Sequence, residues 1–310
     1  MKIVRDLSSL PKNIKYPVVA LGNFDGVHIG HQMIFRRVAE IAQQKKGTGL
    51  AFTFQPHPIT VLNPGSAPLL LTTFRKKMEL IEQSGIDLVW CARFNRNLAK
   101  LEPREFVKKF LVDSLNAKEV VVGFDYAFGR GRQGTIPFLK KLGQEFQFQV
   151  HVIEQVKIDG QGVSSSYVRE LLEEGSVEKA AIFLGRPYSL LSPVVHGHKT
   201  GRSIGFPTAN LDTSRVQIPA TGVYAVRVQF KEKSFNGVAN IGFNPTFNRD
   251  RLSVEVHIFD FEEQIYGRHI KLSFIGRIRG EKNFDSAEVL VEQIKHDIET
   301  ARSILSGWAT

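Results

Sequence analysis

Residues 22–32 read Gly-Asn-Phe-Asp-Gly-Val-His-Ile-Gly-His-Gln, and this stretch decides the fold of the first part of the chain. The mostly apolar run 16–21 precedes it and predicts a buried strand. The stretch is followed by residues 33–42, whose apolar side chains recur at helical spacing. We therefore expect His28 and His31 at a turn that leads from a strand into a helix.

A turn of this kind is suited to bind an anion. Backbone N–H groups at the start of a helix lack partners, and the helix dipole favours negative charge there. Imidazoles can add hydrogen bonds to phosphate oxygens, and glycines let the backbone approach a ligand closely. The glycines of this turn are Gly22, Gly26 and Gly30. The sequence therefore predicts a polyphosphate site, and the alternative is a glycine-rich turn with two exposed histidines.

The composition is that of an ordinary globular protein with room for two domains. The chain has 310 residues, of which 42% are hydrophobic and 23% charged. It has no apolar run long enough for a membrane span, and its first residues lack the apolar core of a secretory signal. Cys91 is the only cysteine, which excludes an internal disulfide and a thiolate metal cage. We expect a cytoplasmic protein.

The net charge of +10 favours anionic partners. The basic residues are scattered, whereas nucleic-acid-binding proteins more often gather them in a patch with interleaved aromatic residues. We therefore expect phosphorylated small molecules as ligands, and neither nucleic acid nor a membrane.

Residues 1–185 alternate between strand and helix patterns, which predicts a doubly wound parallel α/β sheet. In such a sheet ligands bind at the carboxyl ends of the strands, where we expect the loops after Leu21, Phe54 and Val122 to converge. The expected strands are 16–21, 50–54, 88–94, 119–123 and 148–156, and the expected helices are 33–42, 73–84, 103–115, 137–146 and 167–174.

Residues 186–310 show short strand patterns one after another, separated by Gly, Pro and Asn. This succession predicts a small antiparallel β-barrel, closed by one helix over about 286–305. The expected strands are 192–197, 222–230, 233–241, 253–259 and 269–278.

Three further segments of the first half carry polar chemistry. His57 stands between two prolines that fix the backbone at the end of a strand, and a simple proline turn is the alternative, which the motif read alone favours. Asp125 and Phe128 lie in a glycine-rich loop that suits an aromatic heterocycle, with a buried aromatic cluster as the alternative. Residues 164–169, Ser-Ser-Ser-Tyr-Val-Arg, begin a helix; they form a second anion site or merely a good N-cap.

The second half offers a metal–nucleotide site and a general base. Thr208 and Asn210 are two residues apart, so their oxygens face one side of an extended segment. Neutral oxygens of this kind can hold Mg²⁺ when nucleotide phosphates supply the negative charge, while a turn before a strand is the alternative. Glu255 lies on the polar face of an alternating strand, where it could deprotonate a hydroxyl or simply be solvated.

These segments together resemble the bacterial bifunctional riboflavin kinase/FAD synthetase family. GNFDGVHIGH, FQPHP, VVGFDYAFGRGRQG and SSSYVRELLEEGSVEKAAIFLGRPY are similar to its adenylyltransferase half, expected here over 1–185. The resemblance implies that His28, His31 and Arg169 are catalytic and that His57, Asp125 and Phe128 contact FMN. It also implies ATP contacts in this half, from Gly22, Asn23, Phe24, His28, Gly30, His31, Ser164, Ser165, Ser166 and Arg169.

PVVHGHKTGRSIGFPTANL, GVANIGFNPTF, SVEVHIFDF and IRGEKNFDSAEVLVEQIKHD are similar to the riboflavin kinase half, expected over 186–310. The resemblance implies that Glu255 is the catalytic base and that Arg279 and Glu281 lie against the flavin. It implies ATP contacts from Gly201, Phe206, Pro207, Thr208 and Asn210, with Mg²⁺ held by Thr208 and Asn210.

The expected substrates are ATP, riboflavin and FMN, and the expected products are FAD, ADP and pyrophosphate. No permanently bound cofactor and no obligate protein partner are expected. Two other functions stay open on the sequence. His28-Ile-Gly-His31 also matches a motif of class I aminoacyl-tRNA synthetases, although no lysine-rich second signature is visible. A flavin-binding or storage protein is the other alternative.

Overall fold

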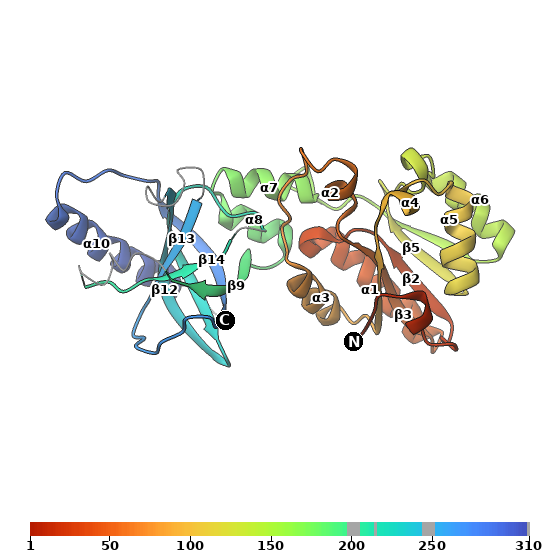
Figure 1. The fold of residues 1–310 in the computed structure, drawn as a ribbon, viewed down its shortest axis with the longest axis horizontal. Helices are drawn as coiled ribbons and strands as arrows, with labels where there is room; N and C mark the ends of the chain where they lie inside the picture. Colours follow the sequence, from red (N-terminus) through yellow and green to blue (C-terminus); the bar gives the residue numbers. More distant parts are fainter. Residues whose placement is uncertain (197–204, 214–215, 244–251, 309–310) are drawn as a thin grey trace. The chain divides into compact units, whose positions relative to one another are not determined.

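The computed structural model describes residues 1–196, 205–213, 216–243 and 252–308. Within these ranges the chain forms two compact units (Figure 1). The first comprises Met1–Pro68 and Phe74–Ser164, and the second comprises Leu69–Thr73 and Ser165–Thr310. The segment Leu69–Thr73 joins the second unit because Leu70 forms a bridge with Val216 and its carbonyl accepts a hydrogen bond from the Gln217 amide.

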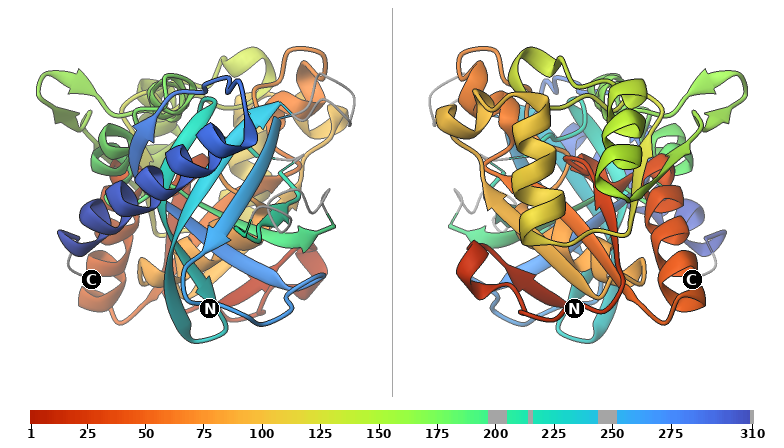
Figure 2. Two further views of the ribbon diagram at one scale, coloured as in Figure 1. Left: turned by 90° about the vertical axis from the view of Figure 1, so that its left-hand side faces the viewer. Right: turned by 90° about the vertical axis from the view of Figure 1, so that its right-hand side faces the viewer.

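The first unit is built on a six-stranded sheet with the order β1-β4-β3-β2-β5-β6, in which every pair of neighbours is parallel. Its strands are β1 (Lys2–Val4), β2 (Pro17–Leu21), β3 (Thr48–Gln55), β4 (Leu88–Arg93), β5 (Glu119–Gly123) and β6 (Gln149–Ile153). Its main helices are α1 (Ile29–Gln44), α2 (Pro58–Leu62), α3 (Phe74–Gln83), α4 (Arg96–Ala99), α5 (Pro103–Phe106), the π-helix η3 (Val107–Ser114) and α6 (Ile136–Phe146). A short hairpin, β7 (Lys157–Ile158) with β8 (Gln161–Gly162), follows (Figure 2).

Helices cover both faces of this sheet, as the alternating pattern predicts. On one face, Val18 and Ala20 of β2 pack with the apolar sides of α1 and α3. On the other face, Val19 and Leu21 pack with η3, α5 and α6. Successive residues of a strand point to opposite faces, so β2 is buried on both sides and all five of its residues are buried.

The sheet order places the predicted ligand loops side by side. Strand β2 lies between β3 and β5, and the three strands run parallel. The turns that carry His28, His57 and Asp125 follow the carboxyl ends of these three strands. The chain also changes direction here, because the strands after β2 build outward to one side before β5 is added on the other. This is the switch point at which open α/β sheets bind ligands.

The second unit contains a closed antiparallel barrel with the order β10-β13-β12-β11-β14-β9. Its strands are β9 (Ser189–Val195), β10 (Ala209–Leu211), β11 (Gly222–Phe230), β12 (Lys233–Phe243), β13 (Leu252–Ile258) and β14 (His269–Arg279). Two helices precede the barrel, α7 (Ser165–Glu173) and α8 (Val177–Leu184), and α10 (Ala287–Ser306) follows it. Figure 2 shows α10 lying along the outside of the barrel, where Ala301 and Leu305 pack on Val223, Ala225 and Ile275.

The expected elements are all present, with shifted ends. The helix predicted from residue 33 begins at Ile29, because His28 caps it, and the helix predicted from residue 167 begins at Ser165. The helix predicted over 103–115 continues beyond α5 as a π-helix. The sequence did not predict strands β1 and β10, which are three residues long and pair at the edge of the sheet and within the barrel.

Candidate functional site

The turn after β2 brings the two histidines into contact. His28 is the N-cap of α1, and its Nδ1 atom accepts a hydrogen bond of 3.3 Å from the backbone N–H of His31. The two imidazoles stack with their centroids 3.6 Å apart, and the rings of Phe24 and His31 lie nearly perpendicular, with centroids 5.4 Å apart. Two ring systems and the first turn of a 16-residue helix therefore lie at one point on the carboxyl edge of the sheet. Such a combination can bind phosphate oxygens.

Glycines at this turn make room for its own rings. A Cβ atom on Gly22 would lie 2.7 Å from the ring of Phe24, and one on Gly30 would lie 3.2 Å from the ring of His28. The Phe24 ring is itself buried, with 1% of its surface exposed. The packing of the turn therefore requires both glycines, whether or not a ligand approaches the backbone. The backbone carbonyl of Asn23 points to the interior, where Lys77 and Thr53 donate to it.

His57 caps the short helix α2, and its Nδ1 atom accepts a hydrogen bond of 3.3 Å from the backbone N–H of Ile59. This bond fixes the ring orientation at the end of β3. The imidazole is half-buried.

The loop after β5 divides its aromatic residues between core and surface. Phe128 is 6% exposed and packs on Phe106, so its side chain belongs to the hydrophobic core, as the aromatic-cluster alternative anticipated. Tyr126 stacks on Phe128, and burial raises the pKa of its phenol. Asp125 is exposed, and Phe124 beside it leaves 44% of its surface exposed. Phe124 is therefore an aromatic ring available for stacking that the sequence did not single out.

The serine segment lies at the start of α7. Ser164 precedes the helix, and Ser165 and Ser166 lie in its first turn. Arg169 is half-buried, and its Nε atom donates to the carbonyl oxygen of Leu69 at 2.8 Å. This contact fixes part of the guanidinium within the second unit. Participation of the segment in a common site with the histidine turn stays a prediction.

The barrel brings together the three residues predicted for kinase chemistry. Asn210 of β10 is the direct cross-strand partner of Glu255 on β13. Thr208, which precedes β10, donates its hydroxyl hydrogen to Oε2 of Glu255 at 3.3 Å. Val254 and Val256 point into the barrel, so Glu255 lies on its outer face with the two neutral oxygen ligands. A carboxylate, a hydroxyl and an amide thus form one polar corner.

Neighbouring residues hold this corner in place. Nδ1 of His257 lies 2.9 Å from the carbonyl oxygen of Pro207, and the rings of Phe206 and His257 meet edge to face. Gly201 lies outside the described residues. Asn240 of β12 is also a direct partner of Glu255, and it is exposed. The sequence reasoning missed Asn240, although it lies in the segment GVANIGF on an alternating strand.

Arg279 contacts the helix α10. Its guanidinium binds both carboxylate oxygens of Asp297 at 2.8–3.1 Å, and the amide of Gln293 donates to the same carboxylate. Asp297 is buried, with 3% of its surface exposed. Glu281 is exposed, and its carboxylate lies over Gly242. The predicted flavin contacts of Arg279 and Glu281 stay predictions.

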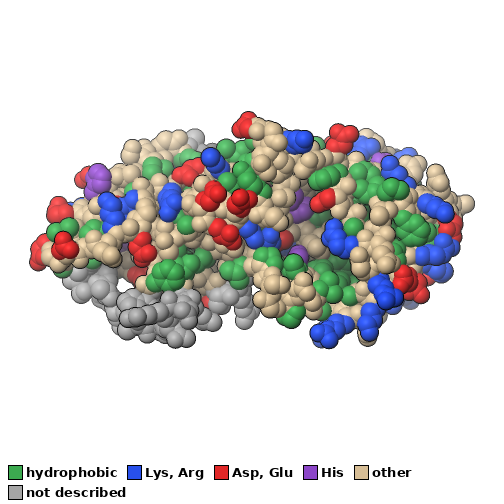
Figure 3. Space-filling view, turned by 90° about the horizontal axis from the view of Figure 1, so that it is seen from above, with side chains coloured by type: hydrophobic (Ala, Val, Ile, Leu, Met, Phe, Trp, Pro, Cys, Tyr) green, Lys and Arg blue, Asp and Glu red, His purple; other side chains and the backbone are tan. Residues whose placement is uncertain are grey.

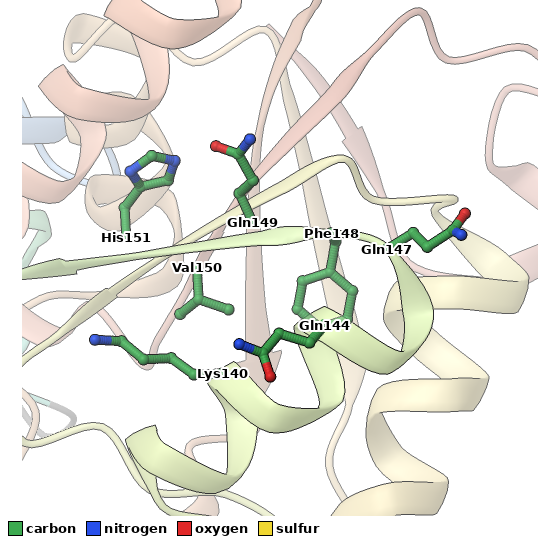
Figure 4. Close-up of a pocket in the computed structure, with 8 residues that line it drawn as sticks. Lys140, Gln144, Gln147, Phe148, Gln149, Val150 and His151 are labelled. Atoms are coloured by element: carbon green, nitrogen blue, oxygen red, sulfur yellow. The ribbon is translucent and has the colours of Figure 1, made fainter.

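A cavity of about 600 Å³ lies elsewhere, between α6 and the edge strand β6 (Figure 4). Val150 and Phe148 point toward α6, whereas Gln149 and His151 point away from it. None of the predicted site residues lines this cavity. His151 reaches the buried carboxylate of Glu119, 2.5 Å away, and that carboxylate also accepts from the Tyr16 hydroxyl.

The described residues contain no group of three or more His, Cys, Asp or Glu side chains that could hold a metal ion. Among the same residues, no helix has the length and apolar character needed to cross a membrane. On the face drawn in Figure 3, basic and acidic side chains are intermingled among the described residues.

Comparison with known proteins gives a consistent result for both units. A family model for FAD synthetase matches residues 10–167, and one for riboflavin kinase matches residues 184–305. The bifunctional riboflavin kinase/FMN adenylyltransferase of Bacillus subtilis is 39% identical over 92% of this chain and 91% of its own length. The enzyme of the same name from Escherichia coli K12 is 38% identical over 97% of both chains. A crystal structure from Streptococcus pneumoniae, titled as a macrolide-efflux protein, is 32% identical with a TM-score of 0.87 and covers 99% of both chains.

Proposed function

Since this chain belongs to the family of bifunctional riboflavin kinase/FMN adenylyltransferases, we propose that its two reactions take place at two sites. One is the polar corner of the barrel formed by Thr208, Asn210 and Glu255, and the other is the histidine turn, which carries His28 and His31. The chain phosphorylates riboflavin to FMN and transfers AMP from ATP to FMN, which gives FAD. We assign the adenylyl transfer to residues 1–185 and the phosphorylation to residues 186–310. The ranges of the two family models support this division.

The kinase assignment rests above all on the hydrogen bond from Thr208 to Glu255, with Asn210 directly opposite Glu255. The Glu255 carboxylate accepts the proton of the riboflavin 5′-hydroxyl. The hydroxyl oxygen then attacks the γ-phosphorus of ATP, and ADP leaves. Positioning and charge stabilisation supply most of the rate enhancement in phosphoryl transfer, so a well-oriented base suffices.

In the adenylyltransferase, an oxygen of the FMN phosphate attacks the α-phosphorus of ATP and pyrophosphate leaves. No covalent enzyme intermediate is needed. His28, His31 and the N-terminus of α1 bind the phosphate oxygens and stabilise the charge that develops on them. The phosphate contacts that the family resemblance implies for Arg169 and the serines 164–166 stay predictions. His57, Asp125 and Phe124 lie after neighbouring strands and contact FMN.

Kinases and adenylyltransferases that use ATP generally need a divalent metal ion. We propose Mg²⁺, bound with ATP at Thr208 and Asn210. The donor set fits, since hydroxyl and amide oxygens are hard ligands and carry no charge that would compete with the phosphates. The ion would neutralise phosphate charge during transfer. We place the enzyme in the cytoplasm.

Two single-residue variants test the assignment. Glu255→Ala should abolish FMN formation from riboflavin while FMN is still converted to FAD. His31→Ala should have the reverse effect. Each reaction is followed with ATP and Mg²⁺ by chromatographic separation of the flavins. Loss of both activities in either variant, with the fold intact, would contradict two independent sites. FMN-dependent exchange of pyrophosphate into ATP separates this enzyme from an aminoacyl-tRNA synthetase, in which exchange depends on an amino acid.

A further inference from the structure

The histidine turn has an unusual backbone. Phe24 and Val27 both adopt positive φ angles, of 54° and 43°. Residues other than glycine rarely adopt positive φ angles, and for a β-branched residue such as Val27 the conformation is a clear outlier. Such a conformation is strained and persists only when surrounding contacts impose it. The turn must therefore be held by contacts from outside it.

Two of these contacts come from nearby residues. The Phe24 ring packs on Phe35, and the side-chain amide of Gln32 donates to the carbonyl oxygen of Val27 at 2.9 Å. Both Gln32 and Phe35 belong to α1, which the turn itself begins, so these two contacts are local in the chain.

Lys77 supplies a contact from a distant part of the chain. It lies on α3, and its ammonium group donates to the carbonyl oxygen of Asn23 at 3.1 Å and to the hydroxyl of Thr53 at 3.4 Å. The Thr53 hydroxyl, on β3, donates to the same carbonyl at 3.2 Å. The peptide that enters the strained turn is thereby tied both to the sheet and to a packed helix.

Burial of the charged ammonium group of Lys77 costs free energy of folding. The residue is only 6% exposed, and Thr53 is wholly buried. Burial lowers the pKa of Lys77, and the negative charge of Asp25 opposes that shift only in part. An apolar side chain of similar length would avoid the cost of burying a charge. The stability of the first unit therefore gives no reason for a lysine here, whereas the position of the turn does.

We propose that Lys77 is a positioning residue for adenylyl transfer, which holds the Asn23 carbonyl and thereby the turn that presents His28 and His31 to the phosphates of ATP. The proposal rests on the function proposed for the histidine turn. Lys77 touches neither substrate nor reacting atoms in this role.

The test is Lys77→Met, which keeps the length of the side chain and removes the ammonium group. A displacement of about 1 Å in a catalytic group can cost roughly 10²-fold in rate. We expect kcat for FMN adenylylation to fall about 10- to 100-fold and the KM for ATP to rise about 3- to 10-fold. Riboflavin phosphorylation by the same chain, an internal control, should stay within about twofold.

Tyr16→Phe is the matched control. It removes a hydrogen bond to the buried Glu119 at the amino ends of the strands, whereas the histidine turn lies at their carboxyl ends. It should leave both activities unchanged. A merely structural role of Lys77 would lower the apparent kcat in proportion to the unfolded fraction, measured by circular dichroism, and leave the KM for ATP unchanged. Either that result or unaltered kinetics would overturn the proposal.

Thr53→Val gives a second test if Lys77→Met does not fold, since it removes only one hydroxyl. It should raise the KM for ATP in the same direction by a smaller factor, and unchanged kinetics would count against the proposal. His31→Ala, assayed in parallel, separates the two ideas. If His31→Ala keeps full adenylyl transfer, the function proposed for the turn fails. If it loses that activity while Lys77→Met does not, the role of Lys77 alone is wrong.

Discussion

The ion pair between Arg279 and Asp297 gives the sharpest prediction about stability. Asp297 of α10 has 4% of its side chain exposed and Arg279 of β14 has 15%. Asp297→Ala leaves the guanidinium largely buried without its partner. Removal of one member of a buried ion pair costs roughly 3–5 kcal/mol. Because water reaches part of Arg279, we expect the lower end, about 3 kcal/mol.

The loss of stability should appear only in the second unit, which contains the barrel. For a unit of about this size, 3 kcal/mol lowers the melting temperature by roughly 6–12 °C. Differential scanning calorimetry of the full chain should show that shift in one transition, with the transition of the α/β unit in place. The double variant Arg279→Met, Asp297→Leu should recover most of the lost stability, because two apolar side chains of similar volume can replace a buried pair.

A loss below about 1 kcal/mol for Asp297→Ala, or a double variant no more stable than the single one, would refute this reasoning. The two variants also separate stability from flavin binding. If Arg279 contacts riboflavin, the double variant should still show a raised KM for riboflavin.

Other perturbations test the two sites and the core. Gly22→Ala should lower adenylyl transfer at least about 10-fold in flavin chromatography while kinase activity stays intact, because its Cβ would lie 2.7 Å from the ring of Phe24; normal activity would contradict the described packing. Thr208→Val should raise the KM for ATP about 10-fold or more in the kinase assay only, and an equal effect on both reactions would contradict the site. Burial raises the pKa of Tyr224 from 10.0 to about 12, so the folded state keeps this phenol protonated to a higher pH than the unfolded chain does. Stability should therefore be complete below about pH 10 and fall between about pH 10 and 12; urea titrations should show a shallower fall for Tyr224→Phe, and an unaltered slope would argue against it. Chelation of divalent cations should stop both reactions until Mg²⁺ is restored, and activity in excess chelator would contradict the metal requirement.

Much of the fold follows from hydrophobic periodicity. Strand β2 reads as a continuous apolar run because both of its faces are buried, and β13 reads as an alternation because one face lines the barrel. Strands β1 and β10 have three residues each, too few for a period, and their existence depends on partners far along the chain. The fold class could thus be predicted, whereas the complete strand count could not.

The sites divide in the same way. The common placement of Thr208, Asn210 and Glu255 could be predicted, since spacing gives the face on which each side chain lies, while their roles stay predictions. The path of the loop after β5 could not, because it depends on which ring fills the core; Phe128 does so and Phe124 does not. The pattern over residues 73–84 likewise gives a helix and does not distinguish Lys77, whose partners Asn23 and Thr53 are brought to it by tertiary packing.

Mixing two defective chains tests the central claim of two separate active sites most directly. Glu255→Ala supplied with riboflavin, ATP and Mg²⁺ should leave riboflavin unchanged, and His31→Ala should stop at FMN. The two variants together in one tube should produce FAD, because FMN released by one chain is adenylylated by the other. A mixture that accumulates only FMN, although Glu255→Ala alone converts added FMN to FAD, would contradict independent sites that exchange FMN through solution.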